Sequence, residues 1–314
     1  MGMHSSSGLG NLYQSLCRFI RICMFCVLSM GPIPNHVAFI MDGNRRYAKK
    51  KKSKEGAGHR AGFSSLISIL KYCYELGVKY VTVYAFSIDN FKRSPDEVTE
   101  VMDLMLEKTE ELLQKESIVH QYGIRVRFIG NLKLVSEALK IAAEKVMKAT
   151  ANNTKCTLLI CIAYTSRDEI VHAVQGSCIN KWKEIRTLKF SKTNNICAEE
   201  VKEENKKNDV DKRDGSAKCL TCFEDSKMMQ EKYSIIKLID IEKHMYMSVA
   251  PEPEILIRSS GETRLSNFLL WQSTNCLLYS PNALWPEIGL WHFILAVLNF
   301  QHNHSYLEKE SNHF

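Results

Sequence analysis

The sequence predicts an α/β protein in which a mostly parallel central sheet is covered by helices. Three observations support this fold class. Short apolar runs recur along the chain, patterns with helical spacing fall between them, and 45% of the 314 residues are hydrophobic. Repeated alternation of strand and helix favours parallel strands joined by helices. The length is sufficient for one large domain or two small ones.

The strands and helices are placed by apolar periodicity and by end signals. Strands are expected at 36–41, 79–86, 124–129, 156–163 and 255–258. A helix over 61–76 should end at Gly77, a suitable C-cap. The next helix should begin after Ser94, because Pro95 suits the first helical position and two acids follow it. Further helices are expected near 132–149, 166–180 and 286–301.

Residues 1–31 form a separate amphipathic segment. Its apolar side chains recur at helical spacing and are Leu9, Leu12, Leu16, Phe19, Ile20, Cys23 and Val27. A basic amphipathic helix can lie in a membrane interface, and it can also pack on the domain or on a partner. A signal peptide is a third interpretation, although the apolar run is short and lacks a small-x-small cleavage site. We expect a membrane-associated segment.

Residues 191–232 interrupt the alternation of strands and helices. They are rich in Lys, Glu, Asp and Asn, so they can bury little apolar surface. We expect a charged surface insertion here, and a regulatory or docking segment is the alternative.

The formal net charge of +7 favours acidic partners such as phosphate esters, nucleic acid or an anionic membrane. Nucleic acid is not favoured, because the basic run 49–52 lacks interleaved aromatic residues and no binding motif is present. The eleven cysteines are odd in number and follow no disulfide framework, which favours a reducing compartment. The chain contains no GxxxxGK[ST] loop, no GxGxxG turn and no DDxxD acid pair.

Polar, arginine-bearing clusters follow three of the predicted strands. They span 42–46, 86–93 and 258–267. Ligands of open parallel sheets bind beyond the carboxyl ends of the strands, so the clusters can converge. Asp42 can hold a hard cation such as Mg²⁺, and Gly43 lets the backbone approach a ligand closely. Arginine forks match phosphate oxygens in pairs, and several of them together suit two anionic groups better than one.

Each of these features also has a purely structural interpretation. An aspartate after a strand is often a turn or helix cap, and His59 can simply start a helix. A lysine run is usually a solvated face. Arg258 and Arg264 flank Glu262 and could form an internal ion-pair network.

Taken together, residues 36–48, 58–62, 84–91 and 258–272 resemble the cis-prenyltransferases, and the likeness extends from about 31 to 306 apart from the insertion. The form of the first motif is most similar to the eukaryotic dehydrodolichyl diphosphate synthases. The resemblance implies a single domain over 32–314 with a hydrophobic product tunnel. It also implies elongation of farnesyl diphosphate by isopentenyl diphosphate units, each adding a cis double bond.

The resemblance assigns roles to the clustered residues. Asp42 would hold Mg²⁺ on the allylic diphosphate, and Asn90 would be tied to proton removal. The allylic diphosphate would be bound by Gly43, Asn44, Arg45, Arg46 and Arg93, with His59 nearby. Further substrate-binding residues would be Tyr47, Ser87 and Phe91. Isopentenyl diphosphate would be seated by Arg258, Arg264 and Ser266.

The resemblance also implies a setting and a partner. Single-subunit members carry a C-terminal Arg-x-Gly, whereas this sequence has Glu310-Ser-Asn-His-Phe314 there. A Nogo-B-receptor-like subunit is therefore expected to supply the motif on the cytosolic face of the endoplasmic reticulum, where the product serves dolichol synthesis and protein glycosylation. The alternative is a non-catalytic scaffold subunit of such a complex.

Overall fold

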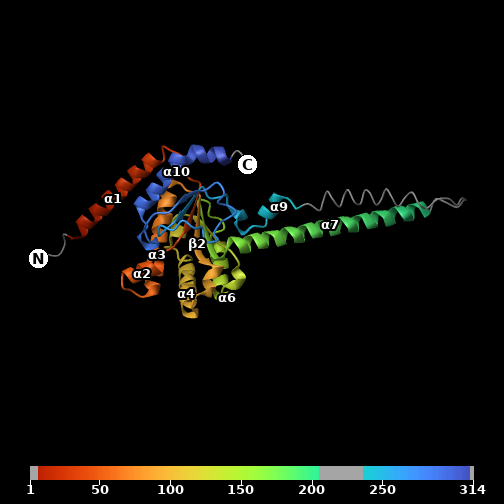
Figure 1. Cartoon of the computed structure of the whole chain (residues 1–314), viewed down its shortest axis with the longest axis horizontal. Helices are drawn as coiled ribbons and strands as arrows, with labels where there is room; N and C mark the ends of the chain where they lie inside the picture. Colours follow the sequence, from red (N-terminus) through yellow and green to blue (C-terminus); the bar gives the residue numbers. More distant parts are fainter. Residues whose placement is uncertain (1–5, 205–235, 312–314) are drawn as a thin grey trace. The chain divides into compact units, whose positions relative to one another are not determined.

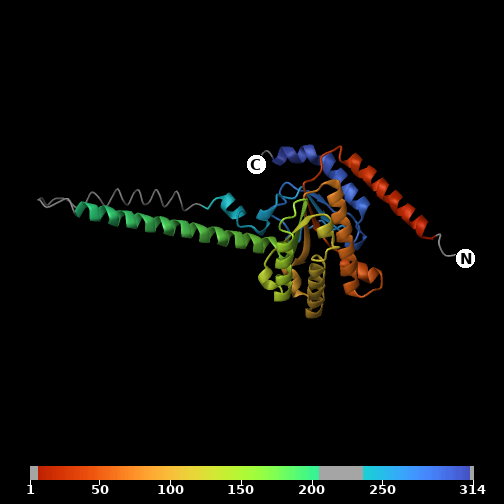
Figure 2. The same ribbon diagram turned by 180° about the vertical axis from the view of Figure 1, so that it is seen from behind.

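The computed structural model describes residues 6–204 and 236–311. The chain divides into two compact units, one made of Met1–Ser166 and Val249–Phe314, the other of Arg167–Ser248. The larger unit contains the sheet and the helices around it (Figure 1, Figure 2). Within the described residues, no helix is long and apolar enough to cross a membrane.

The larger unit is built on a six-stranded sheet in the order β3-β4-β2-β1-β5-β6, in which every pairing is parallel. The strands are β1 (His36–Ile40), β2 (Tyr80–Ser87), β3 (Ile124–Ile129), β4 (Cys156–Tyr164), β5 (Ile255–Arg258) and β6 (Leu277–Tyr279). All five residues of β1 are buried, as expected for a central strand with both faces covered. The predicted α/β class with a mostly parallel sheet is confirmed.

The strand register determines where the site can form. In the pairings of β1, Ile40 lies opposite Tyr84 of β2 and opposite Arg258 of β5. From β1 the chain passes to β2 on one side, and it returns to the other side of β1 only at β5. The carboxyl ends of β1 and β5 therefore form the switch point where ligands of open sheets usually bind.

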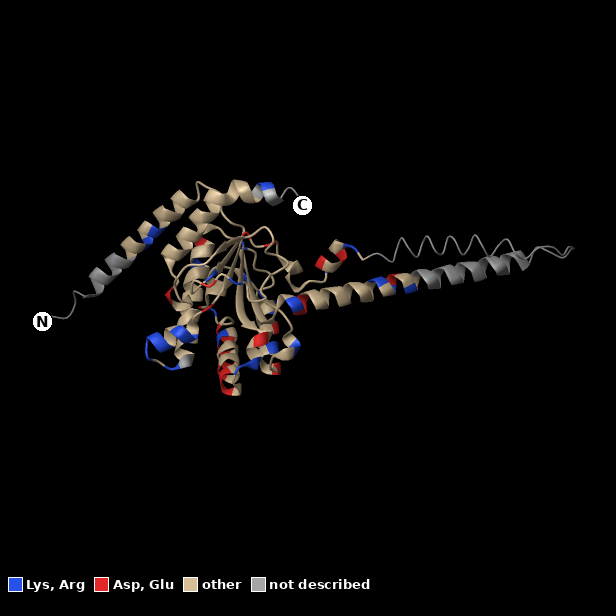
Figure 3. Cartoon of the chain, in the orientation of Figure 1, with Lys and Arg blue, Asp and Glu red and all other residues tan. Residues whose placement is uncertain are grey.

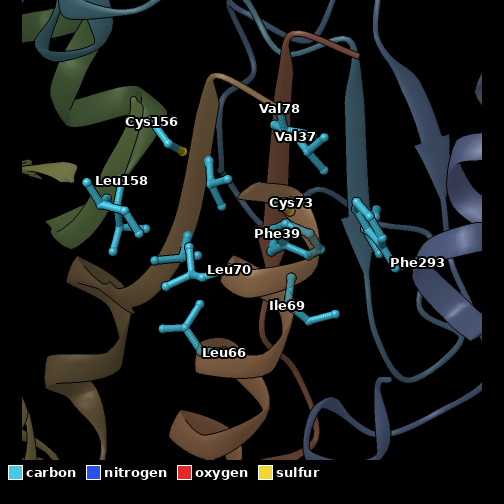
Figure 4. Packing of buried hydrophobic residues seen from close by; sticks show 14 of the residues in the cluster. Val37, Phe39, Leu66, Ile69, Leu70, Cys73, Val78, Cys156, Leu158 and Phe293 are labelled. Atoms are coloured by element: carbon cyan, nitrogen blue, oxygen red, sulfur yellow. The ribbon is translucent and has the colours of Figure 1, made fainter. Parts of the chain in front are cut away.

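Helices cover the sheet and close the core. They are α2 (Asn44–Lys50), α3 (Glu55–Leu76), α4 (Pro95–Glu111), α5 (Ile118–Gln121), α6 (Glu137–Ala149) and α10 (Leu290–Ser311), with 3-10 turns η1 (Ile88–Lys92), η2 (Leu132–Leu134) and η4 (Trp285–Glu287). Figure 4 shows Leu66, Ile69, Leu70 and Cys73 of α3 beside Val37 and Phe39 of β1, and Phe293 of α10 near β5. This buried apolar cluster holds the sheet and helices together.

Four predicted helices differ from the structure in their bounds. The helix expected over 61–76 begins already at Glu55, and the one expected near 286–301 is Leu290–Ser311. The helix expected near 132–149 begins only at Glu137, because Ser136 is extended and its hydroxyl accepts a hydrogen bond from the N–H of Leu139 at 3.4 Å as an N-cap. The helix expected over 166–180 is α7 (Ser166–Glu204), which continues far beyond the last apolar repeat. No proline interrupts the sequence there, and its polar residues include good helix formers.

The N-terminal segment forms α1 (Ser6–Leu28). Its last turns pack on the body, because Phe25 and Leu28 are buried and Arg21 forms a salt bridge of 2.7 Å with Glu75 of α3. α1 also contacts α10, where the two helices meet in Figure 1. The side chains of Leu9 and Leu12 lie outside the described part.

The smaller unit consists of α7 from Arg167 onward, α9 (Leu238–Glu242) and the 3-10 turn η3 (Tyr246–Val249) as far as Ser248. Ser177 of α7 donates a hydrogen bond to the carbonyl of Asp240 at 2.8 Å, and His172 stacks on Tyr246. Of the predicted insertion at 191–232, residues 191–204 lie in α7 and the remainder lies outside the described residues. Its boundaries stay a prediction.

Candidate functional site

Asp42 lies two residues beyond the end of β1, and its backbone is fixed by several hydrogen bonds. Its carbonyl accepts from the hydroxyls of Ser259 at 2.7 Å and Ser260 at 2.9 Å, and from the N–H of Trp285 at 2.9 Å. Its N–H donates to Ser259 Oγ at 2.9 Å. These bonds tie the loop after β1 to the loop after β5, so the Asp42 carboxylate has a defined position.

Glycine is required beside Asp42. Gly43 has φ of 103°, and a Cβ there would lie 2.5 Å from Ser260 Oγ. The helix that follows Gly43, α2, also packs closely against α3. A Cβ on Gly58 would lie 2.1 Å from the carbonyl oxygen of Asn44, and a Cβ on Gly62 would lie 2.3 Å from Asn44 Oδ1. Because Gly58 and Gly62 have no side chain, the motif 58–62 lets α2 pack directly against the backbone of α3.

Two arginines flank the Asp42 carboxylate. Arg258 Nη2 donates to Oδ2 at 2.8 Å, and Arg46 Nη2 lies 3.4 Å from Oδ1. Burial alone would raise the pKa of Asp42. The hydrogen bond from Arg258 and the charges of Arg258 and Arg46 together outweigh burial, so the pKa lies below its usual value. Asp42 is therefore ionised at neutral pH.

Arg258 differs from the other arginines because it is buried, with 6% of its side chain exposed. Its Nη1 donates to Ser266 Oγ at 2.6 Å and to the carbonyl of Arg264. Its Nε is buried with no hydrogen-bond partner. Arg258 therefore connects Asp42 to the loop after β5, and it places a positive charge next to the carboxylate.

Asp42 borders a cavity of about 580 Å³. Its lining residues are Asp42, Arg45, Arg46, Lys49, Ser53, Glu262 and Arg264. Arg45, Arg46 and Arg264 have about half or more of their side chains exposed, so they can turn toward a ligand. Figure 3 shows lysine and arginine gathered on α2 and the turn after it. The cavity thus combines several cations with two carboxylates.

Glu97 was missed as a site residue by sequence reasoning, which interpreted it as a first-turn acid of α4. Its carboxylate accepts from Arg93 Nη1 at 2.9 Å and from Arg45 Nη1 at 3.5 Å. It therefore joins an arginine that precedes α4 to one on α2. Ser53 was missed as well, and no local pattern distinguishes it, whereas Lys49 belongs to the basic run 49–52 noted in the sequence.

His59 lies near these arginines in the first turns of α3. Burial, followed by the charge of Arg93, lowers the pKa of His59. Its Nε2 is buried without a hydrogen-bond partner. A buried nitrogen without a hydrogen-bond partner is unfavourable unless a ligand or water bonds to it. This favours His59 as part of the site.

Ser87 ends β2, and Asn90 and Phe91 lie in the turn η1 that follows; none of the three lines the cavity. The N–H of Ser87 donates to Asn90 Oδ1 at 3.1 Å, and the N–H of Asp89 donates to Ser87 Oγ at 3.1 Å. Phe91 packs edge-on against Phe86. In this structure the three residues shape the turn, and their predicted roles toward substrate stay predictions. Tyr47, half-buried on α2, is likewise not among the cavity residues.

The donor chemistry of the cavity fits Mg²⁺. No cluster of three His, Cys, Asp or Glu side chains that could hold a metal ion occurs in 6–204 or 236–311. Mg²⁺ is commonly held by one or two carboxylates, with substrate phosphates and water completing its shell. Asp42, ionised and 28% exposed at the cavity, is suited to be such a ligand.

Comparisons with known proteins identify the family of this chain. Residues 40–307 match the protein family described as "Putative undecaprenyl diphosphate synthase". Dehydrodolichyl diphosphate synthase 6 of Arabidopsis thaliana is 58% identical over 98% of this chain and 95% of its own length. Rubber cis-polyprenyltransferase HRT2 of Hevea brasiliensis is 51% identical, with 96% of both chains covered. The human dehydrodolichyl diphosphate synthase complex subunit DHDDS is 39% identical over 91% of this chain and 73% of its own.

A solved structure shares the fold. Lavandulyl diphosphate synthase from Lavandula x intermedia, in complex with dimethylallyl diphosphate, superimposes with a TM-score of 0.62 at 25% identity, covering 85% of this chain and 95% of the other. The family match spans most of the sequence and begins at the last residue of β1, next to Asp42. This chain therefore belongs to the undecaprenyl diphosphate synthase-like family and is an enzyme that transfers prenyl groups.

Proposed function

We propose that this chain is a cis-prenyltransferase that condenses isopentenyl diphosphate units onto farnesyl diphosphate, giving a long-chain dehydrodolichyl-type diphosphate. The observation that carries the proposal is the cavity in which Asp42 lies among Arg45, Arg46 and Arg264. This arrangement can hold a diphosphate and a divalent cation together. A non-catalytic scaffold is not favoured, because the chain keeps the carboxylate and its arginines.

The arginines would bind the leaving diphosphate as its charge grows. Arg45 and Arg46 are presented by α2, and Arg264 extends from the loop after β5, so charges come from both sides of the cavity. Cations placed around the leaving diphosphate stabilise the negative charge that develops on it. Mg²⁺, when bound at Asp42, would supply further electrostatic stabilisation of the diphosphate.

Buried Arg258 would act differently from these exposed arginines. It donates hydrogen bonds to the Asp42 carboxylate and to the Ser266 hydroxyl, so its charge lies close to both. Seating isopentenyl diphosphate near Ser266 and Arg264 would bring the second substrate beside the first. Two bound diphosphates would then hold the reacting carbons together and lower the entropic barrier.

The growing apolar product needs a dry surface. Val98, Met102 and Met105 of α4 are half-buried and pack against the core cluster. They recur at helical spacing, so they share one side of α4. We propose that this side is a wall of the product tunnel. Methionine suits this role because its flexible side chain adapts to a lengthening chain.

The setting we propose is the cytosolic face of the endoplasmic reticulum membrane, in a heteromer with a Nogo-B-receptor-like subunit that supplies an Arg-x-Gly segment. The human relative is named as a complex subunit, which supports a partner. The names of the Arabidopsis and tomato relatives support dehydrodolichyl diphosphate, whereas the Hevea relative is named for rubber. Chromatography of the dephosphorylated product distinguishes a chain of dehydrodolichyl length from one of rubber length.

The test is incorporation of radiolabelled isopentenyl diphosphate by the chain co-expressed with its partner. Asp42→Ala and Asp42→Asn should each lose about 100-fold or more in activity, as expected when an electrostatic contact to the reacting group is removed. Asn keeps a partner for Arg258, so a common loss in both variants excludes misfolding as the cause. Asp89→Ala, an exposed aspartate after β2, is the matched control and should remain active. Equal labelling by wild type and the Asp42 variants contradicts the proposal.

A further inference from the structure

The outer side of α1 carries two cysteines within an apolar surface. Phe25 and Leu28 point into the body and are about 5% exposed, whereas Phe19 is 64%, Val27 68% and Met30, just beyond the helix, 87% exposed. Leu16 and Ile20 are exposed as well. These apolar side chains stay exposed although α1 packs against α3 and α10.

Cys23 and Cys26 are exposed and lie inside this surface. At 3.6 residues per turn, Phe19, Cys23 and Cys26 share one side of α1, opposite buried Leu28. Cys17 is also exposed, but helical geometry places it on a different side of α1. Two thiols are thus centred among apolar side chains, and a third on the same helix is not.

The charge of α1 fits the same surface. The helix has no acidic residue between Ser6 and Leu28, and its basic residues are Arg18 and Arg21. Arg21 is paired with Glu75 on the inner side, and Arg18 is exposed. A helix with an apolar outer side and only positive charge suits the anionic headgroup region of a bilayer.

We propose that Cys23 and Cys26 are sites of S-acylation by long-chain fatty acyl groups. In each transfer the cysteine sulfur attacks the carbonyl carbon of a fatty acyl-coenzyme A thioester, directly or through an acyltransferase. A new thioester bond forms, coenzyme A leaves as the thiol, and the cysteine proton passes to it, so no oxidant or reductant is needed. The acyl chains enter the bilayer beside Phe19 and Met30. One acyl chain gives only reversible membrane binding, whereas two acyl chains give stable anchoring.

This modification is independent of the catalytic cavity. Cys23 and Cys26 are not among the residues that line it, so replacing them should leave prenyl transfer unchanged in detergent. Failure of the proposed function would appear in the labelling assay with isopentenyl diphosphate. Failure of the S-acylation proposal would appear only in the acyl-exchange assay and in membrane attachment.

The test is acyl exchange on the full chain expressed with its partner in a eukaryotic cell. Free thiols are blocked, thioesters are cleaved with hydroxylamine, and each released thiol is tagged with a polyethylene glycol maleimide that shifts the band. Wild type should show two hydroxylamine-dependent shifts, Cys23→Ser and Cys26→Ser one each, and the double variant none. Cys17→Ser, and Cys178→Ser at an exposed cysteine of α7, should keep both shifts.

Membrane attachment gives a second measurement. After a high-salt wash, wild type should stay with the membrane fraction and the double variant should be released to a greater extent. Absence of any hydroxylamine-dependent shift in wild type, or shifts that persist in the double variant, overturns the proposal. In that case the two cysteines are simply small apolar residues of the helix.

Discussion

At the scale of single residues, the acidic partners of the arginines decide how the site is organised. Sequence patterns identified Asp42 and the arginines because they follow apolar strands directly. They could not identify Glu97, since its position in the first turn of α4 has a sufficient local explanation. Arg93 lies only four residues before Glu97, but it is the fold that brings Arg45 within reach of the same carboxylate.

Glu97→Gln is expected to raise the KM for the allylic diphosphate about fivefold to tenfold, with little change in kcat. Glu97 is 13% exposed and holds both guanidinium groups, so losing its charge releases them at a cost of about 1 kcal/mol of binding free energy. Steady-state kinetics with farnesyl diphosphate as the varied substrate measures this. Glu107→Gln removes a comparable pair with Arg60 at the exposed surface between α3 and α4, and it should behave as wild type. A lower KM in Glu97→Gln would mean that Glu97 competes with the ligand.

At the scale of elements, the buried strands were predictable and the short elements were not. The runs at 36–41 and 255–258 agree with β1 and β5 within a residue, because an apolar run ends where polar clusters begin. α2 is seven residues long and consists largely of basic residues, so it shows no apolar repeat. β6 has three residues, none of them buried, and carries no alternation. Such elements form through tertiary contacts, which the sequence pattern does not record.

The contact between α2 and α3 gives a prediction about elements. Gly58→Ala should lower activity more than stability, because its Cβ would lie 2.1 Å from the Asn44 carbonyl and must displace α2 with Arg45 and Arg46. Gly77→Ala is the control. It has φ of 98° but nothing within 4 Å, so it should cost about 1 kcal/mol of stability without affecting the site. Urea unfolding and the labelling assay are measured on both variants. Equal specific activity of the two folded variants would show that α2 does not need this close contact.

At the scale of the whole molecule, strand order was the part of the fold that the sequence left open. Alternation of strands and helices indicates a parallel sheet, but several orders satisfy it. The observed order places β1 between β2 and β5, which brings Asp42 next to Arg258 across a separation of more than 200 residues. Of the three clusters predicted to converge, 42–46 and 258–267 contribute residues to the cavity lining, whereas the turn at Ser87 and Asn90 does not. Arg93, at the end of the cluster 86–93, is joined to Arg45 of α2 through Glu97.

The opposite end of the central strands is held by a buried histidine. His36, the first residue of β1, is fully buried, with Nδ1 donating to the Pro251 carbonyl at 2.6 Å and Nε2 accepting from Thr82 Oγ1 at 2.7 Å. It therefore joins β1, β2 and the segment before β5. Burial outweighs the backbone hydrogen bonds and lowers the pKa of His36 to about 4. The imidazole is neutral in the folded protein at pH values where it is protonated in the unfolded chain.

This difference makes the stability of the whole fold depend on pH. Between the unfolded pKa of about 6.5 and the folded pKa of about 4, the unfolded chain binds the extra proton, so the free energy of unfolding falls as pH decreases. The stabilisation from neutral His36 is fully present above pH 6.5, and about 3 kcal/mol of it is lost by pH 4. His36→Gln should be less stable at pH 7.5 yet show a shallower decline between pH 6.5 and 4. Urea unfolding at several pH values measures both slopes, with His120→Gln at an exposed position of α5 as the substitution control. Parallel slopes for wild type and His36→Gln would show that His36 is not the group that senses pH.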